Sequence, residues 1–268
     1  MKGQTEYSMK DGNKIPAVGL GTWNLKDAEC TRVVKKALKL GYTHIDTAEL
    51  YGNEEYIGEA IKDFDRSKIF VTSKVRGENL RHDDVTKACN RSLDALGTEY
   101  LDLYLIHWPS EEVPLEETLK AFRKLLNEGK TRSAGVSNFD RSLLKTALEM
   151  ADFPITVNQV EFHPYRYRKN LLDFCKASGV VVTAYSPLGV GKLLQDTAIN
   201  DVAARYNKSA AQVCLRWSLQ KGVAVIPKAR SEEHLKENLD IFDWSLTERD
   251  VRKLDLLKKS KNSRRRRK

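Results

Sequence analysis

Residues of four chemically active types lie at or just after the ends of three successive segments that have the composition of buried β-strands. Asp46 lies near the end of the first segment, Lys74 near the end of the second and His107 at the end of the third, while Tyr51 follows Asp46 by five residues. Where such strands are neighbours in a parallel barrel, their carboxyl ends meet on one face. We therefore expect a carboxylate, a phenol, an ammonium and an imidazole to converge there.

This combination suits the donation of a proton to a carbonyl oxygen. A phenol has a pKa of about 10, which is high for an acid catalyst near neutral pH. Lys74 beside Tyr51 would stabilise the phenolate and lower that pKa, at ~1.4 kcal/mol of interaction for each pH unit. Asp46 would keep Lys74 charged, because an unpaired buried ammonium is costly. His107 would hydrogen-bond the substrate oxygen.

Each of these residues also has a purely structural interpretation. A strand-end aspartate often only caps a loop, a histidine before Trp-Pro is more often structural, and a lone tyrosine usually packs. All four together on adjacent strand ends favour function. An aldolase that uses Lys74 as a Schiff base is a rival, but it requires a neutral amine, and Asp46 argues against one. Borohydride trapping of substrate on Lys74 would support that rival.

The elements that would position these residues alternate along the chain. A hairpin is expected at 7–17, with its turn at Asp11-Gly12-Asn13. Eight β-rich segments follow, several of them continuous apolar runs typical of strands covered on both faces; they are 18–22, 44–48, 69–75, 101–107, 132–138, 156–162, 180–186 and 223–228. Helical segments with apolar residues three and four apart separate them, for example 31–40, 83–96, 115–127 and 210–219.

The helix boundaries carry their own signals. Ser231 is placed to cap a helix after the eighth strand, and a further helix is expected at 247–258. Glycine, which tolerates the left-handed conformation that closes a helix, follows several helical segments; these glycines are Gly41, Gly97, Gly129, Gly179 and Gly222.

Eight strand-then-helix units in order predict an α/β fold, a (β/α)8 TIM barrel with an N-terminal β-hairpin and an extra C-terminal helix. A doubly wound sheet would show a glycine fingerprint after its first strand. Here Gly19-Leu20-Gly21 lacks the third glycine, since residue 24 is Asn24, and Gly189-Val190-Gly191-Lys192 fits neither the dinucleotide nor the P-loop pattern. We expect residues 1–260 to form one catalytic domain.

Composition narrows the class of protein. The 268 residues are 41% hydrophobic and 31% charged, which is ordinary for a soluble enzyme and enough for a large core. No apolar run approaches the ~18 residues of a membrane span, and the first residues lack the apolar core of a secretory signal. We expect a cytoplasmic protein whose cysteines are reduced and structural, because Cys30, Cys89, Cys175 and Cys214 match no zinc or redox spacing. No metal site is expected.

Much of the net charge of +9 lies at the C-terminus. Residues 261–268 (KNSRRRRK) hold six basic residues, so the remainder carries +3. We interpret 261–268 as a disordered basic tail. Nucleic-acid binding is the alternative, but no aromatic residue interrupts the basic run. A salt-dependent affinity for DNA that is lost when residues 261–268 are deleted would show an effect of the tail alone.

Taken together, these motifs resemble those of the aldo-keto reductase family over nearly the whole chain, with the short bacterial and archaeal-type reductases most similar. The matching stretches occur in the family's order: Gly19-Leu20-Gly21-Thr22-Trp23, Asp46-Thr47-Ala48, Tyr51-Gly52-Asn53-Glu54, Thr72-Ser73-Lys74-Val75, Leu105-Ile106-His107-Trp108-Pro109, Gly135-Val136-Ser137-Asn138-Phe139, Asn158-Gln159-Val160-Glu161-Phe162-His163-Pro164, Ala184-Tyr185-Ser186-Pro187-Leu188-Gly189 and Ile226-Pro227-Lys228. The resemblance implies an NADPH-dependent reductase of aldehydes and ketones whose catalytic tetrad is Asp46, Tyr51, Lys74 and His107.

The resemblance also implies a cofactor site. Ser137, Asn138 and Gln159 would hold the nicotinamide carboxamide, and Tyr185 would stack on the ring. The other residues implied to contact the cofactor are Gly21, Thr22, Trp23 and Asp46, then Ser186, Leu188 and Gly189 along the pyrophosphate, Lys228, Ala229 and His234 at the 2′-phosphate, and Glu237 and Asn238 at the adenine.

Two departures from the family bear on cofactor choice. Ala229 stands where many relatives have serine, and His234 where they often have arginine. A guanidinium grips a phosphate with two hydrogen bonds, whereas histidine is mostly neutral at physiological pH. Lys228 remains, with Arg230 as a second candidate. We expect a reduced preference for NADPH and use of NADH as well.

The substrate pocket implied by the resemblance is apolar, with walls from Trp23, Leu50 and Trp108 beside Tyr51 and His107. We expect small carbonyl substrates such as aldehydes, diketones or keto sugars, and a monomer or weak dimer that needs neither nucleic acid nor membrane. The alternative is a regulatory subunit that binds cofactor with little turnover, like the reductase-related subunits of potassium channels. Co-purification with a stable partner would favour that alternative.

Overall fold

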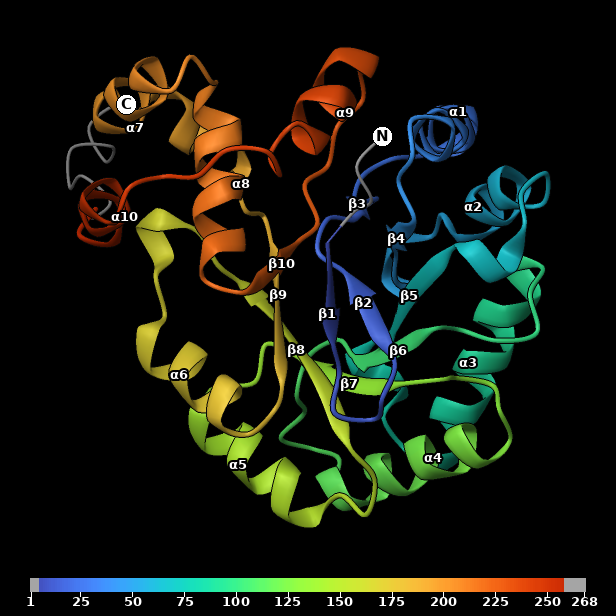
Figure 1. The fold of residues 1–268 in the computed structure, drawn as a ribbon. Coiled ribbons are helices and arrows are strands. Elements are labelled where there is room, and N and C mark those ends of the chain that lie inside the picture. Colours follow the sequence, from blue (N-terminus) through green and yellow to red (C-terminus); the bar gives the residue numbers. More distant parts are fainter. Residues whose placement is uncertain (1–4, 258–268) are drawn as a thin grey trace, which may run out of the picture.

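The fold is built around a sheet of eight parallel strands (Figure 1), and the computed structural model describes residues 5–257. The strands are β3 (Leu20–Gly21), β4 (His44–Asp46), β5 (Phe70–Val75), β6 (Leu103–Ile106), β7 (Ala134–Ser137), β8 (Ile155–Glu161), β9 (Val181–Tyr185) and β10 (Val223–Val225). They pair in chain order from β3 to β10. Each lies inside the segment expected for it except β8, which begins one residue earlier.

The two ends of this sheet meet. Val18 forms a parallel bridge with Val225, and the amide of Gly19 donates to the carbonyl of Val225 at 2.8 Å. Strand β10 is therefore bonded to the start of the first barrel strand, and the eight strands close. The predicted (β/α)8 barrel is confirmed.

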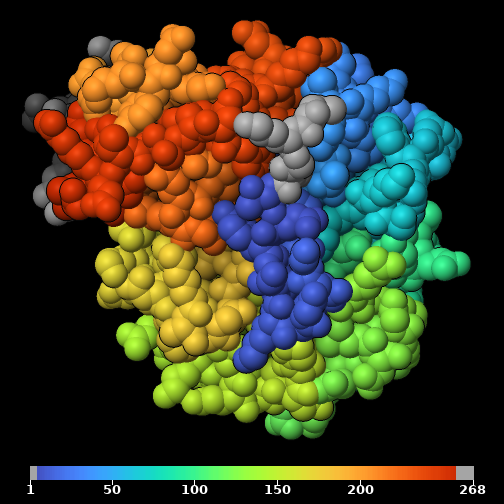
Figure 2. Space-filling view, in the orientation of Figure 1, coloured from blue at the N-terminus to red at the C-terminus, as the bar shows by residue number. Residues whose placement is uncertain are grey.

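The predicted N-terminal hairpin is also confirmed and covers one end of the barrel. Strands β1 (Glu6–Ser8) and β2 (Lys14–Pro16) pair antiparallel. Met9 and Ile15 of the hairpin pack against a small buried cluster of Leu103, Leu105 and Val157. Figure 2 shows the hairpin lying across the middle of this face. The carboxyl ends of the strands, where barrel enzymes hold their sites, lie at the other end.

Ten α-helices are found in residues 5–257, and most surround the barrel (Figure 1). They are α1 (Asp27–Lys39), α2 (Glu54–Ile61), α3 (His82–Leu96), α4 (Leu115–Asn127), α5 (Arg141–Met150), α6 (Lys169–Ala177), α7 (Thr197–Arg205), α8 (Ala210–Gln220), α9 (Glu232–Leu239) and α10 (Glu248–Asp255). Both α7 and α8 lie between β9 and β10; α8 coincides with the helix predicted at 210–219, whereas α7 was not predicted from the sequence. Helix α10 is the extra C-terminal helix, and residue 258 of its predicted span lies outside the described residues.

Local side-chain bonds explain several helix ends. Ser209 and Gln212 form a reciprocal capping box at the start of α8. Ser231 accepts a hydrogen bond from the amide of His234 and caps α9, as predicted. Gly97, which ends α3, has φ of 60°, a left-handed conformation that glycine adopts at little cost.

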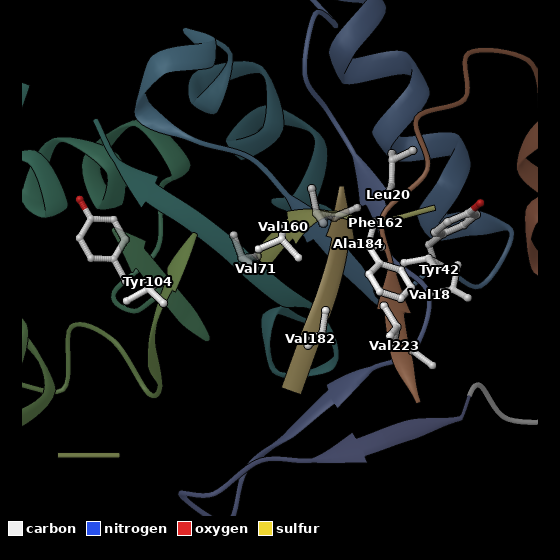
Figure 3. Close-up of a cluster of buried hydrophobic side chains, with 14 of the residues drawn as sticks. Val18, Leu20, Tyr42, Val71, Tyr104, Val160, Phe162, Val182, Ala184 and Val223 are labelled. Carbon is white, nitrogen blue, oxygen red and sulfur yellow. The ribbon is translucent and has the colours of Figure 1, made fainter. Parts of the chain in front are cut away.

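The core consists of the inward faces of these helices and of apolar side chains on the strands. Trp217, Tyr42 and Phe122 are among its largest fully buried side chains. Figure 3 shows β-branched strand residues at its centre, including Val71, Val160 and Val182. Valine side chains of this kind pack well on a pleated surface that is covered on both sides.

Helix α2 packs closely against α3 at Gly58, where a Cβ atom would lie 2.6 Å from the Ala95 carbonyl oxygen. Gly58→Ala is therefore expected to destabilise the protein by ~1–3 kcal/mol, because the backbone of α3 must move. Urea denaturation measures the change. Gly77→Ala is the control, since a Cβ at Gly77 meets no atom within 4 Å. Equal stabilities of the two variants would contradict the packing argument.

Three further findings concern the described part of the chain. Its four cysteines, Cys30, Cys89, Cys175 and Cys214, are free and buried. In residues 5–257, no helix is both long and apolar enough to cross a membrane, and no group of three or more histidine, cysteine, aspartate or glutamate residues is arranged to hold a metal ion. The basic segment 261–268 lies outside the described residues.

Candidate active site

The carboxyl ends of the barrel strands open into one large cavity of about 1040 Å³. Its lining includes Asp46, Tyr51 and His107 of the predicted tetrad. The volume is at the upper end of the ~300–1,000 Å³ typical of ligand pockets. The catalytic face predicted from the strand ends is therefore the face that carries the cavity.

The tetrad is assembled by neighbouring strands. Asp46 ends β4, Lys74 lies on β5 and His107 directly follows β6, and these three strands pair in succession. Lys74 Nζ donates to Asp46 Oδ1 at 2.6 Å and to the carbonyl oxygen of Thr47 at 2.7 Å. It also donates to the Tyr51 hydroxyl at 3.4 Å. The rings of Tyr51 and His107 meet edge to face, 5.7 Å between centroids.

The Asp46–Lys74 pair is buried behind the cavity wall, with side-chain exposures of 2% and 0%. Burial disfavours a charged lysine, but attraction to Asp46 and Tyr51 outweighs it, and the pKa of Lys74 is raised above its ordinary value. Burial also raises the pKa of Asp46, against the opposing attraction of Lys74. We take the pair as an ion pair, since Asp46 also accepts a hydrogen bond from Gln159.

The pKa of Tyr51 differs from the sequence-based expectation. Burial raises it above the ordinary value of a phenol, although the Lys74 ammonium acts to lower it. The expected net lowering is thus wrong for the protein without ligand, because desolvation of the phenolate is larger than its attraction to Lys74. Tyr51 consequently holds its proton through the neutral range.

His107 is neutral over the same range. Its pKa is lowered to about 3, first by burial and then by the nearby charge of Lys74. The Nδ1 atom is buried and has no hydrogen-bond partner among residues 5–257. An uncharged imidazole in this position can hydrogen-bond a ligand, but it is a poor source of a proton.

The polar residues expected at a nicotinamide gather next to the tetrad. Ser137, Asn138, Gln159 and Tyr185 all line the cavity. The Tyr185 hydroxyl donates to Asn138 Oδ1 at 2.9 Å, and Asn138 Nδ2 donates to the His107 carbonyl oxygen at 3.0 Å. Gln159 Nε2 donates to Asp46 Oδ2 at 2.7 Å, an arrangement that the sequence did not predict.

The segment after β9 lies along the cavity with an unusual backbone. Ser186, Gly189, Val190 and Gly191 have φ of 47°, 57°, 55° and 81°. A left-handed conformation is unfavourable for a β-branched residue such as Val190, which is also 70% exposed. Strain of this kind is found preferentially at ligand sites. Ser186 and Leu188 line the cavity, whereas Gly189 is not part of its lining.

At the far end of the cavity the lining includes Lys228, His234, Glu237 and Asn238. Lys228 Nζ lies 5.6 Å from the centre of the Trp23 ring. Arg230, the second candidate for a phosphate, instead donates to the Asn24 carbonyl oxygen at 2.9 Å and pairs with Glu29 at 3.3 Å. It lies outside the cavity lining, whose lysines are Lys208 and Lys228. Lys208 is paired with Asp240 at 2.7 Å, so we take Lys228 as the cation available to a phosphate.

Two other residues expected at the cofactor are not part of the lining. Thr22 is buried, and its hydroxyl donates to the Asp46 carbonyl oxygen at 2.9 Å. Ala229 is 5% exposed. Gly21 and Trp23 do line the cavity. A Cβ atom at Gly21 would lie 2.5 Å from the Ile226 carbonyl oxygen, so β3 and the segment after β10 approach too closely for a side chain.

Sequence reasoning missed the part of the wall that α7 and the start of α8 provide. The missed lining residues are Pro187, Val190, Gly191, Leu194, Asn200, Ala203, Ala204, Lys208, Ser209, Ala210, Ala211, Ile226 and Pro227. The small residues Ala203-Ala204 and Ala210-Ala211 were the available signal, since small side chains on two helices permit close approach of a ligand.

The part of the cavity beside Tyr51 and His107, where the substrate pocket is predicted, has an apolar mouth. Trp23, Leu50 and Trp108 line the cavity and are 56%, 51% and 51% exposed. Apolar side chains that are exposed together, as these three are in one cavity lining, commonly mark ligand surfaces. The cavity thus joins an apolar mouth, a buried ion pair with a phenol, and a polar channel that ends at a lysine.

A closed (β/α)8 barrel with such a site is typical of one class of proteins, the barrel oxidoreductases. Comparison with known proteins indicates the same class. Residues 17–259 match the model of the aldo/keto reductase family. Glyoxal reductase of Bacillus subtilis is 44% identical over 254 residues, which cover 94% of this chain and 92% of the relative. An aldo/keto reductase from Brucella melitensis is 40% identical, with a TM-score of 0.89 over 94% of this chain and 98% of its own.

A thermostable aldo-keto reductase in complex with the inhibitor epalrestat is 42% identical, with a TM-score of 0.90 over 94% of this chain and 98% of its own. The chain belongs to the aldo/keto reductase family. It is accordingly an oxidoreductase.

Proposed function

We propose that this protein reduces small aldehydes and ketones to alcohols with NADPH. The observation that carries the proposal is the Tyr51 hydroxyl in the cavity wall, hydrogen-bonded to a buried Lys74 that Asp46 holds charged. A protonated phenol next to a fixed cation is suited to give its proton to an oxygen that becomes negative.

Each residue of the site has its own role in the proposed reduction. Tyr51 and His107 donate hydrogen bonds to the carbonyl oxygen and orient the substrate. A bound reduced nicotinamide would supply the hydride that the carbonyl carbon accepts. As negative charge develops on the oxygen, Tyr51 transfers its proton, and Lys74 stabilises the phenolate that is left. Asp46 offsets the burial of Lys74, and Trp23, Leu50 and Trp108 exclude water from the substrate.

The lining of the cavity fits a nicotinamide dinucleotide in donor type and in extent. Ser137, Asn138 and Gln159 would hold the carboxamide, and Tyr185 would stack on the ring. Gly21, Trp23, Ser186 and Leu188 would lie near the ribose and pyrophosphate, with Gly189 in the same loop just outside the lining. Lys228, with His234 beside it, would bind the 2′-phosphate, and Glu237 and Asn238 the adenine. Thr22 and Ala229 lie behind the cavity wall, so any contact of theirs with the cofactor would come from their backbone atoms.

Lys228→Ala is expected to weaken NADPH binding by about 10- to 100-fold, because a hydrogen bond to a charged group contributes ~1.5–3 kcal/mol. NADH affinity should not change. His234→Arg should strengthen NADPH binding, since a guanidinium grips a phosphate with two hydrogen bonds. Quenching of tryptophan fluorescence by each cofactor provides the dissociation constants.

Arg230→Ala is the control for this prediction, because Arg230 pairs with Glu29 outside the cavity. It should leave the ratio of the two affinities as in the wild type. Equal wild-type affinities for NADPH and NADH would contradict the cofactor preference. A Lys228→Ala variant with unchanged NADPH affinity would contradict the role of the lysine.

The function is tested by following the loss of near-ultraviolet absorbance of NADPH, and in parallel of NADH, with a nitro-substituted benzaldehyde and with glyoxal. Glyoxal is included because one relative is named glyoxal reductase. Turnover by the wild type supports the proposal. Tight NADPH binding without turnover of either aldehyde would favour the regulatory-subunit alternative, and absence of binding would contradict the cofactor site.

A further inference from the structure

Glu49 connects the turn that carries Tyr51 to the segment that follows Lys74. It is the first residue of the short 3-10 helix Glu49–Tyr51 and lies two residues before Tyr51. Its side chain is only 14% exposed and is not part of the cavity lining. The residue therefore has no direct access to a substrate.

The Glu49 carboxylate accepts three hydrogen bonds. Oε2 accepts from the backbone amide of Arg76 at 3.2 Å. Oε1 accepts from Asn79 Nδ2 at 2.7 Å and from Arg91 at 2.8 Å. Arg76 lies two residues after Lys74, just beyond β5, so one carboxylate joins the neighbourhoods of Tyr51 and Lys74.

These bonds add to the backbone bonds that close the turn. Its backbone is closed locally, because the amide of Tyr51 donates to the Ala48 carbonyl oxygen at 2.9 Å and the amide of Gly52 to the Glu49 carbonyl oxygen at 3.3 Å. The three side-chain bonds of Glu49 instead determine where the finished turn sits relative to β5 and α3.

The position of the turn matters because the Tyr51–Lys74 contact is long. At 3.4 Å it exceeds the usual 2.7–3.2 Å of an N–H···O hydrogen bond, so it is weak and easily broken. Electrostatic interaction in a buried site changes steeply with distance. A misplacement of about 1 Å in an active site can lower the rate about 10²-fold.

We propose that Glu49 is a positioning residue, which holds the Tyr51 hydroxyl within reach of Lys74 through its bonds to Arg76, Asn79 and Arg91. The inference rests on the proposed function, in which Tyr51 donates the proton. It assigns the Glu49 side chain a role in the rate of proton transfer and none in the binding of substrate or cofactor.

The test compares Glu49→Ala and Glu49→Gln with the wild type. Glu49→Ala is expected to lower kcat by about 10- to 100-fold and to leave KM for the aldehyde and Kd for NADPH unchanged. Glu49→Gln should recover most of kcat, because its amide oxygen can still accept from Asn79 or from the Arg76 amide. Glu116→Ala, which removes an exposed partner of Lys120 on α4, is the control and should match the wild type.

Hydrogen exchange provides a readout that needs no turnover. In Glu49→Ala the backbone amides of residues 51 and 52 should exchange about tenfold faster or more, because the turn opens more readily, while those of β8 stay protected. An inactive wild type would contradict the proposed function, and exchange would then still show whether Glu49 holds the turn. A Glu49→Ala variant with wild-type kcat, unchanged exchange, or a loss confined to KM would overturn the inference.

Discussion

Tyr51→Phe is expected to lower kcat by about 10²- to 10⁴-fold, the range that a positioned general acid contributes. The substitution removes only the hydroxyl, and the ring can keep its edge contact with His107. His107 is a poor substitute as a proton donor, because its pKa of about 3 leaves it neutral. Steady-state kinetics with an aldehyde, together with NADPH binding by fluorescence, measure the effect.

The affinity of Tyr51→Phe for NADPH should equal that of the wild type, since the hydroxyl bonds only to Lys74 within residues 5–257. Tyr56→Phe is the matched control, because Tyr56 lies on α2 outside the cavity lining, and it should be fully active. A Tyr51→Phe variant that keeps more than about a tenth of wild-type kcat would mean that another group or water supplies the proton.

Lys74→Met is expected to destabilise the protein by ~3–5 kcal/mol, because it leaves the Asp46 carboxylate buried without its partner. It should also lower kcat by about 10²-fold or more, since the cation that stabilises the phenolate is lost. Methionine has a similar length and an apolar character, so the volume at position 74 is largely kept. Denaturant unfolding and steady-state kinetics test the two effects separately.

A double-mutant cycle measures the interaction free energy between Asp46 and Lys74. Asp46→Asn should also destabilise, whereas the double variant Asp46→Asn with Lys74→Met buries no charge and should be more stable than the sum of the single losses predicts, by ~0.5–3 kcal/mol. Lys120→Met removes an exposed ion pair with Glu116 and should change stability little. Additive losses, or a stable Lys74→Met protein, would contradict a charged pair at this site.

The sequence was a good guide to the elements because their signals are local. Apolar runs and helical periodicity are properties of a few consecutive residues, and they predicted all eight barrel strands. Capping at Ser231 and the hairpin turn at 11–13 depend on neighbours in the chain. The tetrad followed from the same information, because residues that end successive strands of a parallel barrel must lie side by side.

Features that depend on contacts between distant segments were not accessible in this way. Gln159 donates a hydrogen bond to Asp46, 113 positions away in the sequence. Arg230 forms an ion pair with Glu29 and donates a hydrogen bond to the carbonyl oxygen of Asn24, 206 positions away. No spacing rule predicts such pairs. They exist because the closed barrel brings β8 opposite β4 and the segment after β10 next to the loop after β3.

Residue types and their order along the chain were therefore enough to indicate the barrel, the family and the proposed catalytic residues, because strand order and side-chain chemistry can be inferred from short segments. The packed fold was needed for everything that depends on burial and on three-dimensional proximity. It raised the pKa of Tyr51 where Lys74 alone would have lowered it, because desolvation depends on all the surrounding atoms. It also brought Glu49 between Tyr51 and the end of β5, because only tertiary packing sets one loop against another.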